Sequence, residues 1–196
     1  MTPRAGGGAS GGARGWRRPV LMGLWAGVAL LCLLSLVSFI TWRAELREIR
    51  ALVAPHIEAG ADPVQVMYQT RDFVRDHVGY GRPPSYFLLP VFSFMRPTAL
   101  QVIHGGGDCG YRSRAFIVIA RLYGVQAHKR ALYHTNGVPL HAVAEVEIEG
   151  QPPYYVDALY NVVHVRDDGT PLSLPELADD RVLRASIARE VAGGNQ

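Results

Sequence analysis

The stretch His104–Val125, HGGGDCGYRSRAFIVIARLYGV, decides how the rest of the chain is interpreted. Three glycines and an aspartate precede Cys109, and apolar residues recur at helical spacing after it. An aspartate is a typical helix N-cap, and a glycine such as Gly124 is typical just beyond a helix end. The pattern therefore predicts a helix from about Cys109 to Tyr123 that begins with a cysteine.

A cysteine at the start of a helix is a candidate nucleophile. The unpaired N–H groups and the helix dipole favour the thiolate and lower the pKa of the thiol. The same N–H groups, that of Cys109 above all, can hold an oxyanion, and the run 105–107 of glycines would let a substrate backbone approach closely. Considered alone, Cys109 has a simpler alternative as a buried structural thiol. A nucleophile also needs a base and a group that orients it.

Beyond Gly124 the apolar period changes from helical spacing to two, which is typical of strands. Strands are expected at 125–133, 141–148, 154–157 and 161–165, with a turn at Asn136-Gly137. If 148–150 form a three-residue loop, His141 directly faces Asp157 on one side of the sheet, with Cβ atoms ~5 Å apart. Pro152 and Pro153 weaken the ladder near this turn, so a wider loop is the alternative.

Helices are expected before these strands and after them. The apolar spacing and the turn residues predict helices over 43–58, from 62 to 77, from 97 to 103 and from 175 to 191. Helices first and a meander of antiparallel strands afterwards predict an α+β domain. The alternating acids Glu145, Glu147 and Glu149 share the His141 face and are interpreted as mostly solvated, with Glu145 at the border of the pocket.

The N-terminal part of the chain contains a long apolar run. No charged residue occurs from Pro19 to Trp42, and about 20 apolar residues in a helix cross a bilayer. We expect a Gly/Arg-rich disordered tail at 1–18, a transmembrane signal anchor at 19–42 and one domain at 43–196. A cleaved signal peptide is the alternative for the apolar run.

Charge gives the expected orientation and excludes one class of partner. Four arginines precede the span and three follow it, which places the N-terminus in the cytoplasm and the domain outside. The chain has 20 Lys and Arg and 17 Asp and Glu, and four of the arginines lie in the tail. The domain is therefore almost neutral, which argues against nucleic-acid binding.

Neither a disulfide nor a metal or other cofactor is expected. Cys32 lies in the apolar run and Cys109 in the domain, so the two cysteines cannot pair across the membrane boundary. A lone thiol in an oxidising compartment points to reactivity. His104, His128, His134 and His164 lack the tight spacing of a zinc site.

The order Cys109–His141–Asp157 resembles the transglutaminase-like superfamily, relatives of papain-like cysteine peptidases. The matching segments are GGGDCGYRSRAFIVIARLYGVQAHKR, HAVAEVEIEG and YYVDALY, and the resemblance covers roughly residues 64–165. It implies a papain/transglutaminase-like fold with the nucleophile helix packed on an antiparallel sheet. It also implies that Cys109 is the nucleophile, His141 the base and acid, and Asp157 the residue that orients the imidazole.

Two departures from the family pattern leave the substrate open. An aromatic residue often follows the His by two positions where this chain has Val143, and a proline often follows the Asp where it has Ala158. A second oxyanion donor is not evident, and Gln101 and His104 are only candidates for it.

The expected function is a membrane-anchored thiol hydrolase or acyltransferase acting on a protein or peptide outside the cytoplasm. Peptidase, amidase and transamidase activity are all compatible with the sequence, because the acceptor decides among them. The alternatives are a non-catalytic module of the same fold in an envelope or exopolysaccharide assembly, and a purely structural anchor.

Overall fold

The computed structural model describes residues 17–81, 97–133 and 136–192 of the chain. The chain divides into two compact units, one up to Glu45 and one from Leu46 onward. Most of the tail expected at 1–18 lies outside the described residues, and Arg17 already belongs to a helix.

The first unit contains most of helix α1, Arg17–Val53. Its apolar part is exposed throughout and has a mean hydropathy of 2.5 in its most apolar window. By length and composition this helix can cross a membrane.

The second unit begins with the C-terminal end of α1 and the short 3-10 helix η1, Ala54–His56. The helix expected over 43–58 is therefore not a separate element, because α1 continues through Trp42 without a break. The α-helix ends before Pro55, whose ring cannot continue it. Ile49 and Val53 on this end are buried in the core of the unit.

Three capped helices follow, and each cap is visible in the sequence. Asp62 and Gln65 form a capping box at the start of α2, Pro63–His77. Thr98 and Gln101 form another at the start of α3, Ala99–Gly105. Asp108 caps α4, Cys109–Leu122, so the predicted cysteine-first helix is confirmed.

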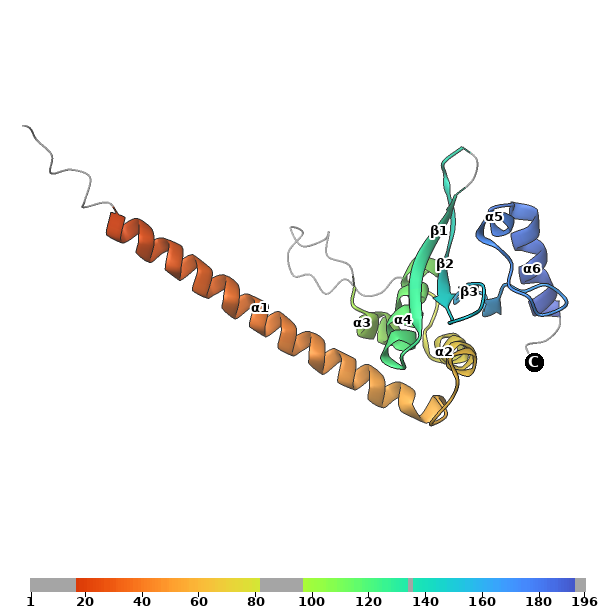
Figure 1. Cartoon of the computed structure of the whole chain (residues 1–196), viewed down its shortest axis with the longest axis horizontal. Helices are drawn as coiled ribbons and strands as arrows, with labels where there is room; N and C mark the ends of the chain where they lie inside the picture. The colour runs from red at the N-terminus through yellow and green to blue at the C-terminus, as the bar shows by residue number, and fades with distance from the viewer. Residues whose placement is uncertain (1–16, 82–96, 134–135, 193–196) are drawn as a thin grey trace, which may run out of the picture. The chain divides into compact units, whose positions relative to one another are not determined.

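The sheet has four antiparallel strands in the order β1-β2-β3-β4. They are β1 Gln126–Tyr133, β2 Pro139–Glu147, β3 Tyr154–Asp157 and β4 Val162–Val163. Helices α2, α3 and α4 share one apolar core with sheet residues such as Ala144 and Val156. The alternate residues Val143 and Tyr155 pack into a second core with α5, Leu174–Leu177, and α6, Asp180–Ala192. The second unit is therefore an α+β fold, as expected (Figure 1).

Two expectations about the C-terminal half need correction. The helix expected over 175–191 is two helices, because the Asp179 side chain accepts the Arg181 N–H and starts a new one. The predicted three-residue loop between β2 and β3 is also wrong. Val146 pairs with Tyr154 and Ala144 with Val156, so the loop covers 148–153 and the register moves by two residues. Pro152 and Pro153 cannot donate to the ladder, which accounts for the wider loop.

The two-residue shift leaves His141 and Asp157 on the same face of the sheet. Side chains alternate with a period of two, so only an odd shift would have separated them. Asp157 now lies opposite the Val143 position and diagonal to His141, at a distance that long side chains bridge. Gly150 adopts the left-handed backbone expected of it, with φ 75°.

Candidate functional site

Cys109 lies at the first position of α4 and is half-buried. The Asp108 carboxylate accepts the Tyr111 N–H at 3.1 Å, which fixes the start of the helix. The N–H groups of Cys109 and Gly110 point out of the first turn with no partner among the described residues. Two backbone donors are therefore available beside the sulfur.

The glycine run before Cys109 also packs against the chain's own backbone, a role that the sequence did not indicate. Gly107 donates its N–H to the Gly79 carbonyl at 3.0 Å. A Cβ at Gly106, where φ is 81°, would lie 2.7 Å from the same carbonyl oxygen. The run is needed because the backbone after α2 passes directly against it.

His141 and Asp157 are joined by a hydrogen bond. The imidazole Nε2 lies 2.5 Å from Asp157 Oδ2, and the aspartate is completely buried. The other oxygen of Asp157 accepts the N–H groups of Leu159 and Tyr160 at 2.9 and 3.1 Å. The carboxylate is thus held on both sides, and it fixes one ring nitrogen of His141.

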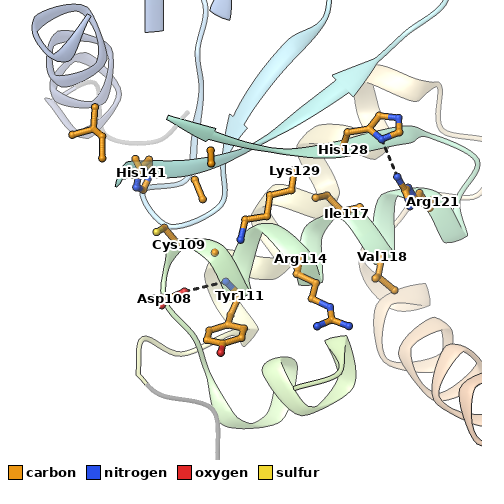
Figure 2. Close-up of a pocket in the computed structure, with 14 residues that line it drawn as sticks. Asp108, Cys109, Tyr111, Arg114, Ile117, Val118, Arg121, His128, Lys129 and His141 are labelled. Carbon is orange, nitrogen blue, oxygen red and sulfur yellow. Dashed lines mark hydrogen bonds between the residues drawn. The ribbon is translucent and has the colours of Figure 1, made fainter. Parts of the chain in front are cut away.

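The second ring nitrogen of His141 is left for Cys109, and the two side chains lie next to each other (Figure 2). The pKa of the Cys109 thiol is lowered, and the largest cause is its hydrogen bond with His141. The charge of the imidazole and the Ala142 N–H lower this pKa further, whereas burial and the charge of Asp108 raise it. Burial lowers the pKa of His141, but hydrogen bonds to Asp157 and Cys109 outweigh it and raise the value to about 9. These two pKa directions both favour a thiolate–imidazolium pair over a neutral thiol and imidazole.

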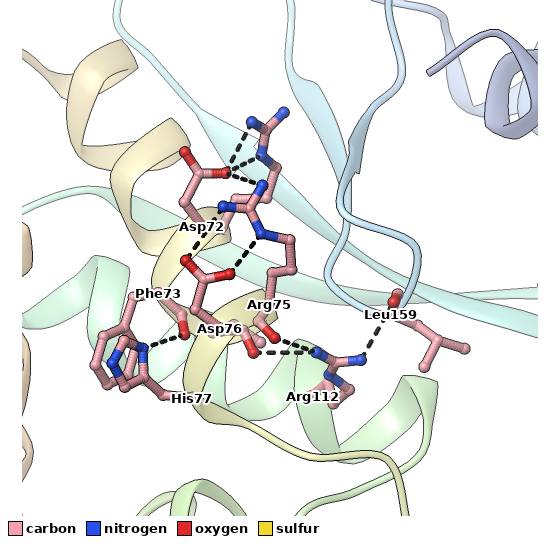
Figure 3. A network of polar contacts seen from close by, with 9 residues as sticks. Asp72, Phe73, Arg75, Asp76, His77, Arg112 and Leu159 are labelled. Atoms are coloured by element: carbon pink, nitrogen blue, oxygen red, sulfur yellow. Dashed lines mark hydrogen bonds and ion pairs between the residues drawn. The ribbon is translucent and has the colours of Figure 1, made fainter. Parts of the chain in front are cut away.

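Two buried residues of α4 position this pair, and no sequence pattern indicates either of them. Ser113 donates its hydroxyl to the Ala142 carbonyl at 3.1 Å, which ties the cysteine helix to the strand residue after His141. Arg112 donates to the Leu159 carbonyl at 3.2 Å and to the Val74 carbonyl at 3.0 Å. Figure 3 shows Arg112 between the end of α2 and the turn after Asp157.

A second histidine lies behind the site. His164 is completely buried, and its Nδ1 lies 3.0 Å from the Ser186 hydroxyl on α6. Its Nε2 has no partner among the described residues. Burial lowers the pKa of His164 to about 4, although the charge of Asp157 acts in the opposite direction.

The two candidates for a second oxyanion donor have other partners. The Gln101 side chain accepts the Thr98 N–H at 2.9 Å in the capping box of α3. His104 is exposed and lies 3.5 Å from Glu48. The N–H groups of Cys109 and Gly110 are the donors that the geometry offers instead.

Glu145 is not a solvated strand acid. It is buried, its carboxylate accepts Arg130 Nε at 2.5 Å and the Tyr155 hydroxyl at 3.0 Å, and it does not line the cavity beside Cys109. The structure places it in the second core, on the face that α5 and α6 cover. Among the described residues, no three His, Cys, Asp or Glu side chains converge as metal ligands would.

A cavity of about 980 Å³ opens beside Cys109 and His141. Its walls come from α4, from β1 and from the start of β2. A cavity of this size holds a substantial part of a peptide or small molecule next to the sulfur. Comparison of the chain with known protein families, curated proteins and solved structures finds no match.

Proposed function

We propose that this chain is a membrane-anchored thiol hydrolase or acyltransferase in which Cys109, His141 and Asp157 form a catalytic triad. The observation that carries the proposal is the 2.5 Å contact between His141 and Asp157 at the point where the Cys109 thiol has a lowered pKa. A nucleophile, a base and an orienting acid from three separate elements rarely converge for structural reasons alone.

In the first half of the reaction the Cys109 thiolate attacks the carbonyl carbon of an amide. The tetrahedral oxyanion is held by the N–H groups of Cys109 and Gly110. His141 gives its proton to the departing nitrogen, the C–N bond breaks, and a thioester with Cys109 remains. Asp157 keeps the imidazole oriented and stabilises its charged form.

In the second half the thioester is released. Neutral His141 takes a proton from water or from an amine, which attacks the thioester carbonyl and returns the sulfur as thiolate. Water gives a carboxylic acid, and an amine gives a new amide. Hydrolysis is the expected outcome outside the cytoplasm because water is abundant there, and the substrate is a protein or peptide.

Fold and location are part of the same proposal. The cysteine-first helix packed on an antiparallel sheet, with His and Asp on neighbouring strands, supports a transglutaminase-like fold. The apolar helix supports a single-pass anchor, and four arginines before it against three after it support an N-terminus in the cytoplasm. The catalytic unit then lies on the outer side of the bacterial membrane.

Alkylation by iodoacetamide tests the proposal directly. A full-length Cys32→Ser chain in detergent leaves Cys109 as the single thiol. We expect it to react at pH 6.5 about 100-fold faster than its His141→Ala derivative, because an ordinary thiol is about 1% ionised two units below its pKa. Equal, slow rates in the two proteins would refute the triad and favour a non-catalytic module of the same fold.

A further inference from the structure

The residues that line the cavity beside Cys109 are spread along most of α4. Cys109 and His141 lie at one end, while Arg121 and His128 lie at the other (Figure 2). The helical rise of 1.5 Å per residue separates Cys109 from Arg121 by about 18 Å along α4. An extended peptide covers this length with about five residues.

The charged side chains along this cavity are mostly cations. Arg114, Arg121 and Lys129 line it, and Asp108 is the one carboxylate among the lining residues. The Asp108 carboxylate is already used as the cap of α4. The walls therefore present more positive than negative charge to whatever enters.

Two of these cations have no acceptor among the described residues. Lys129 and Arg114 form no hydrogen bond or ion pair with any described residue, whereas Arg121 contacts the His128 ring at 3.2 Å. Elsewhere in the unit cations are paired, as Arg130 is with Glu145 and Arg166 with Glu176. Unpaired cations that line one cavity leave donors for an anionic ligand.

Lys129 reaches the immediate surroundings of the sulfur. A Cβ built on Gly110 would lie 2.8 Å from Lys129 Nζ. The ammonium therefore occupies the space that a side chain at the residue after Cys109 would fill. A carboxylate bound by Lys129 would belong to a substrate residue close to the bond that Cys109 attacks.

We propose that this cavity selects peptide substrates with an acidic residue next to the scissile bond, recognised by Lys129 and Arg114. This inference rests on the proposed function and names the substrate class of the same site. The apolar wall residues Ile117, Val118 and Leu140 contact the aliphatic part of the bound segment. The spread of the cavity along α4 and its position beside Cys109 favour an extended peptide over a lipid headgroup.

Peptide binding tests the acidic preference without catalysis. The probe is a dye-labelled hexapeptide of alternating alanine and glutamate, with a twin that has glutamine for glutamate. A full-length Cys109→Ala chain in neutral detergent should bind the glutamate peptide at least tenfold more tightly by fluorescence anisotropy. Lys129→Gln should weaken that binding about fivefold, the usual size of one exposed charge contact.

Arg181→Gln is the matched control, because it removes the same charge from a fully exposed side chain on α6 outside the cavity. Equal binding of the two peptides, no binding of either, or equal losses in Arg181→Gln and Lys129→Gln would overturn the inference. Displacement of the peptide by phosphatidylglycerol vesicles but not by phosphatidylcholine vesicles, with the same dependence on Lys129, would reassign the site to a lipid headgroup and also overturn it.

Alkylation separates this inference from the proposed function. Iodoacetate and iodoacetamide both alkylate the Cys109 thiolate through their CH₂ carbon with release of iodide, but only iodoacetate has a carboxylate. The ratio of the two rates should fall about fivefold in Lys129→Gln and stay constant in Arg181→Gln. A ratio that does not respond to Lys129 contradicts the acidic preference even when Cys109 is reactive. Slow alkylation by both reagents with intact peptide binding contradicts the triad alone.

Discussion

His141 and His164 both experience the charge of Asp157, yet the pKa of His141 is raised to about 9 and the pKa of His164 is lowered to about 4. Burial is the first cause acting on each, and it lowers the pKa in both cases. The difference is that the His141 ring donates a hydrogen bond to Asp157 Oδ2 and is also hydrogen-bonded with Cys109, and neither bond acts on His164.

The Asp157 carboxylate raises the pKa of His141 strongly and that of His164 only weakly, because its hydrogen-bonding capacity is already used. The remaining oxygen of Asp157 is used by two backbone N–H groups, so it offers nothing to His164. His164 therefore stays neutral and pairs with Ser186 in a structural contact. Proximity to an acid is a weaker cause than a hydrogen bond to it.

The largest expected effect comes from Asp157→Asn. The amide keeps an oxygen for the N–H groups of Leu159 and Tyr160 but removes the charge and presents an N–H to His141. We expect acylation of Cys109 by p-nitrophenyl acetate to fall about 10⁴-fold, as loss of an orienting acid does in other triads. The pKa of His141, followed by NMR of the ring protons, should fall from about 9, and that of His164 should fall slightly because Asp157 raises it. A His141 that still titrates near 9 would contradict the assigned role of Asp157.

The next largest effect should appear in folding rather than in reactivity. His164→Ala leaves a cavity and an unpaired Ser186 hydroxyl, which should lower the free energy of unfolding by about 2–4 kcal/mol. Urea denaturation followed by circular dichroism measures this loss. Alkylation of Cys109 at pH 7 should stay within twofold of the parent rate, and a collapse of that rate would assign His164 to the catalytic machinery.

The pH dependence should separate alkylation of Cys109 from acyl transfer, whose rates should diverge by about tenfold per pH unit above the pKa of His141. Because the pKa of Cys109 is lowered, alkylation by iodoacetamide should persist well below the ordinary pKa of a thiol. Acyl transfer from an amide also needs the His141 proton, so its rate should decline as pH rises through about 9. Alkylation needs only the thiolate and should not decline there. An acyl-transfer rate that keeps rising above pH 9 would show that the proton comes from elsewhere.

A matched pair of serine variants should give the smallest effects. Ser186→Ala and Ser113→Ala each remove one buried hydrogen bond of 3.0–3.1 Å, and each should cost about 1 kcal/mol of unfolding free energy. Only Ser113→Ala should also slow alkylation of Cys109, because its bond holds α4 against the residue after His141. Equal alkylation rates in the two variants would remove Ser113 from the positioning of the pair.

The sequence predicted local features better than distant contacts. The cysteine-first helix follows from Asp108 and the apolar spacing after it, both of which act within a few residues. The predicted register between β2 and β3 was wrong by two residues, yet His141 and Asp157 still share one face because the strand period is two. The transglutaminase-like identity of the fold stays a prediction.

The residues that support the site were missed because their partners are far away in the chain. Arg112 binds the Leu159 carbonyl 47 positions along, and Ser113 binds the Ala142 carbonyl 29 positions along. Glu145 was misinterpreted for the same reason, since alternation alone cannot show that α5 and α6 cover that face. Buried polar side chains have no periodic pattern of their own.

Asp157 does two jobs at once, since the same carboxylate that fixes the imidazole also closes the turn at Leu159 and Tyr160. Natural selection for a well-folded chain would therefore preserve this acid even in a descendant that had abandoned chemistry. The sulfur of Cys109 has no such role in a turn, so selection for folding would not preserve it. In a survey of homologous genes, the residue at position 109, rather than the one at position 157, would therefore distinguish catalytically active proteins from inactive ones.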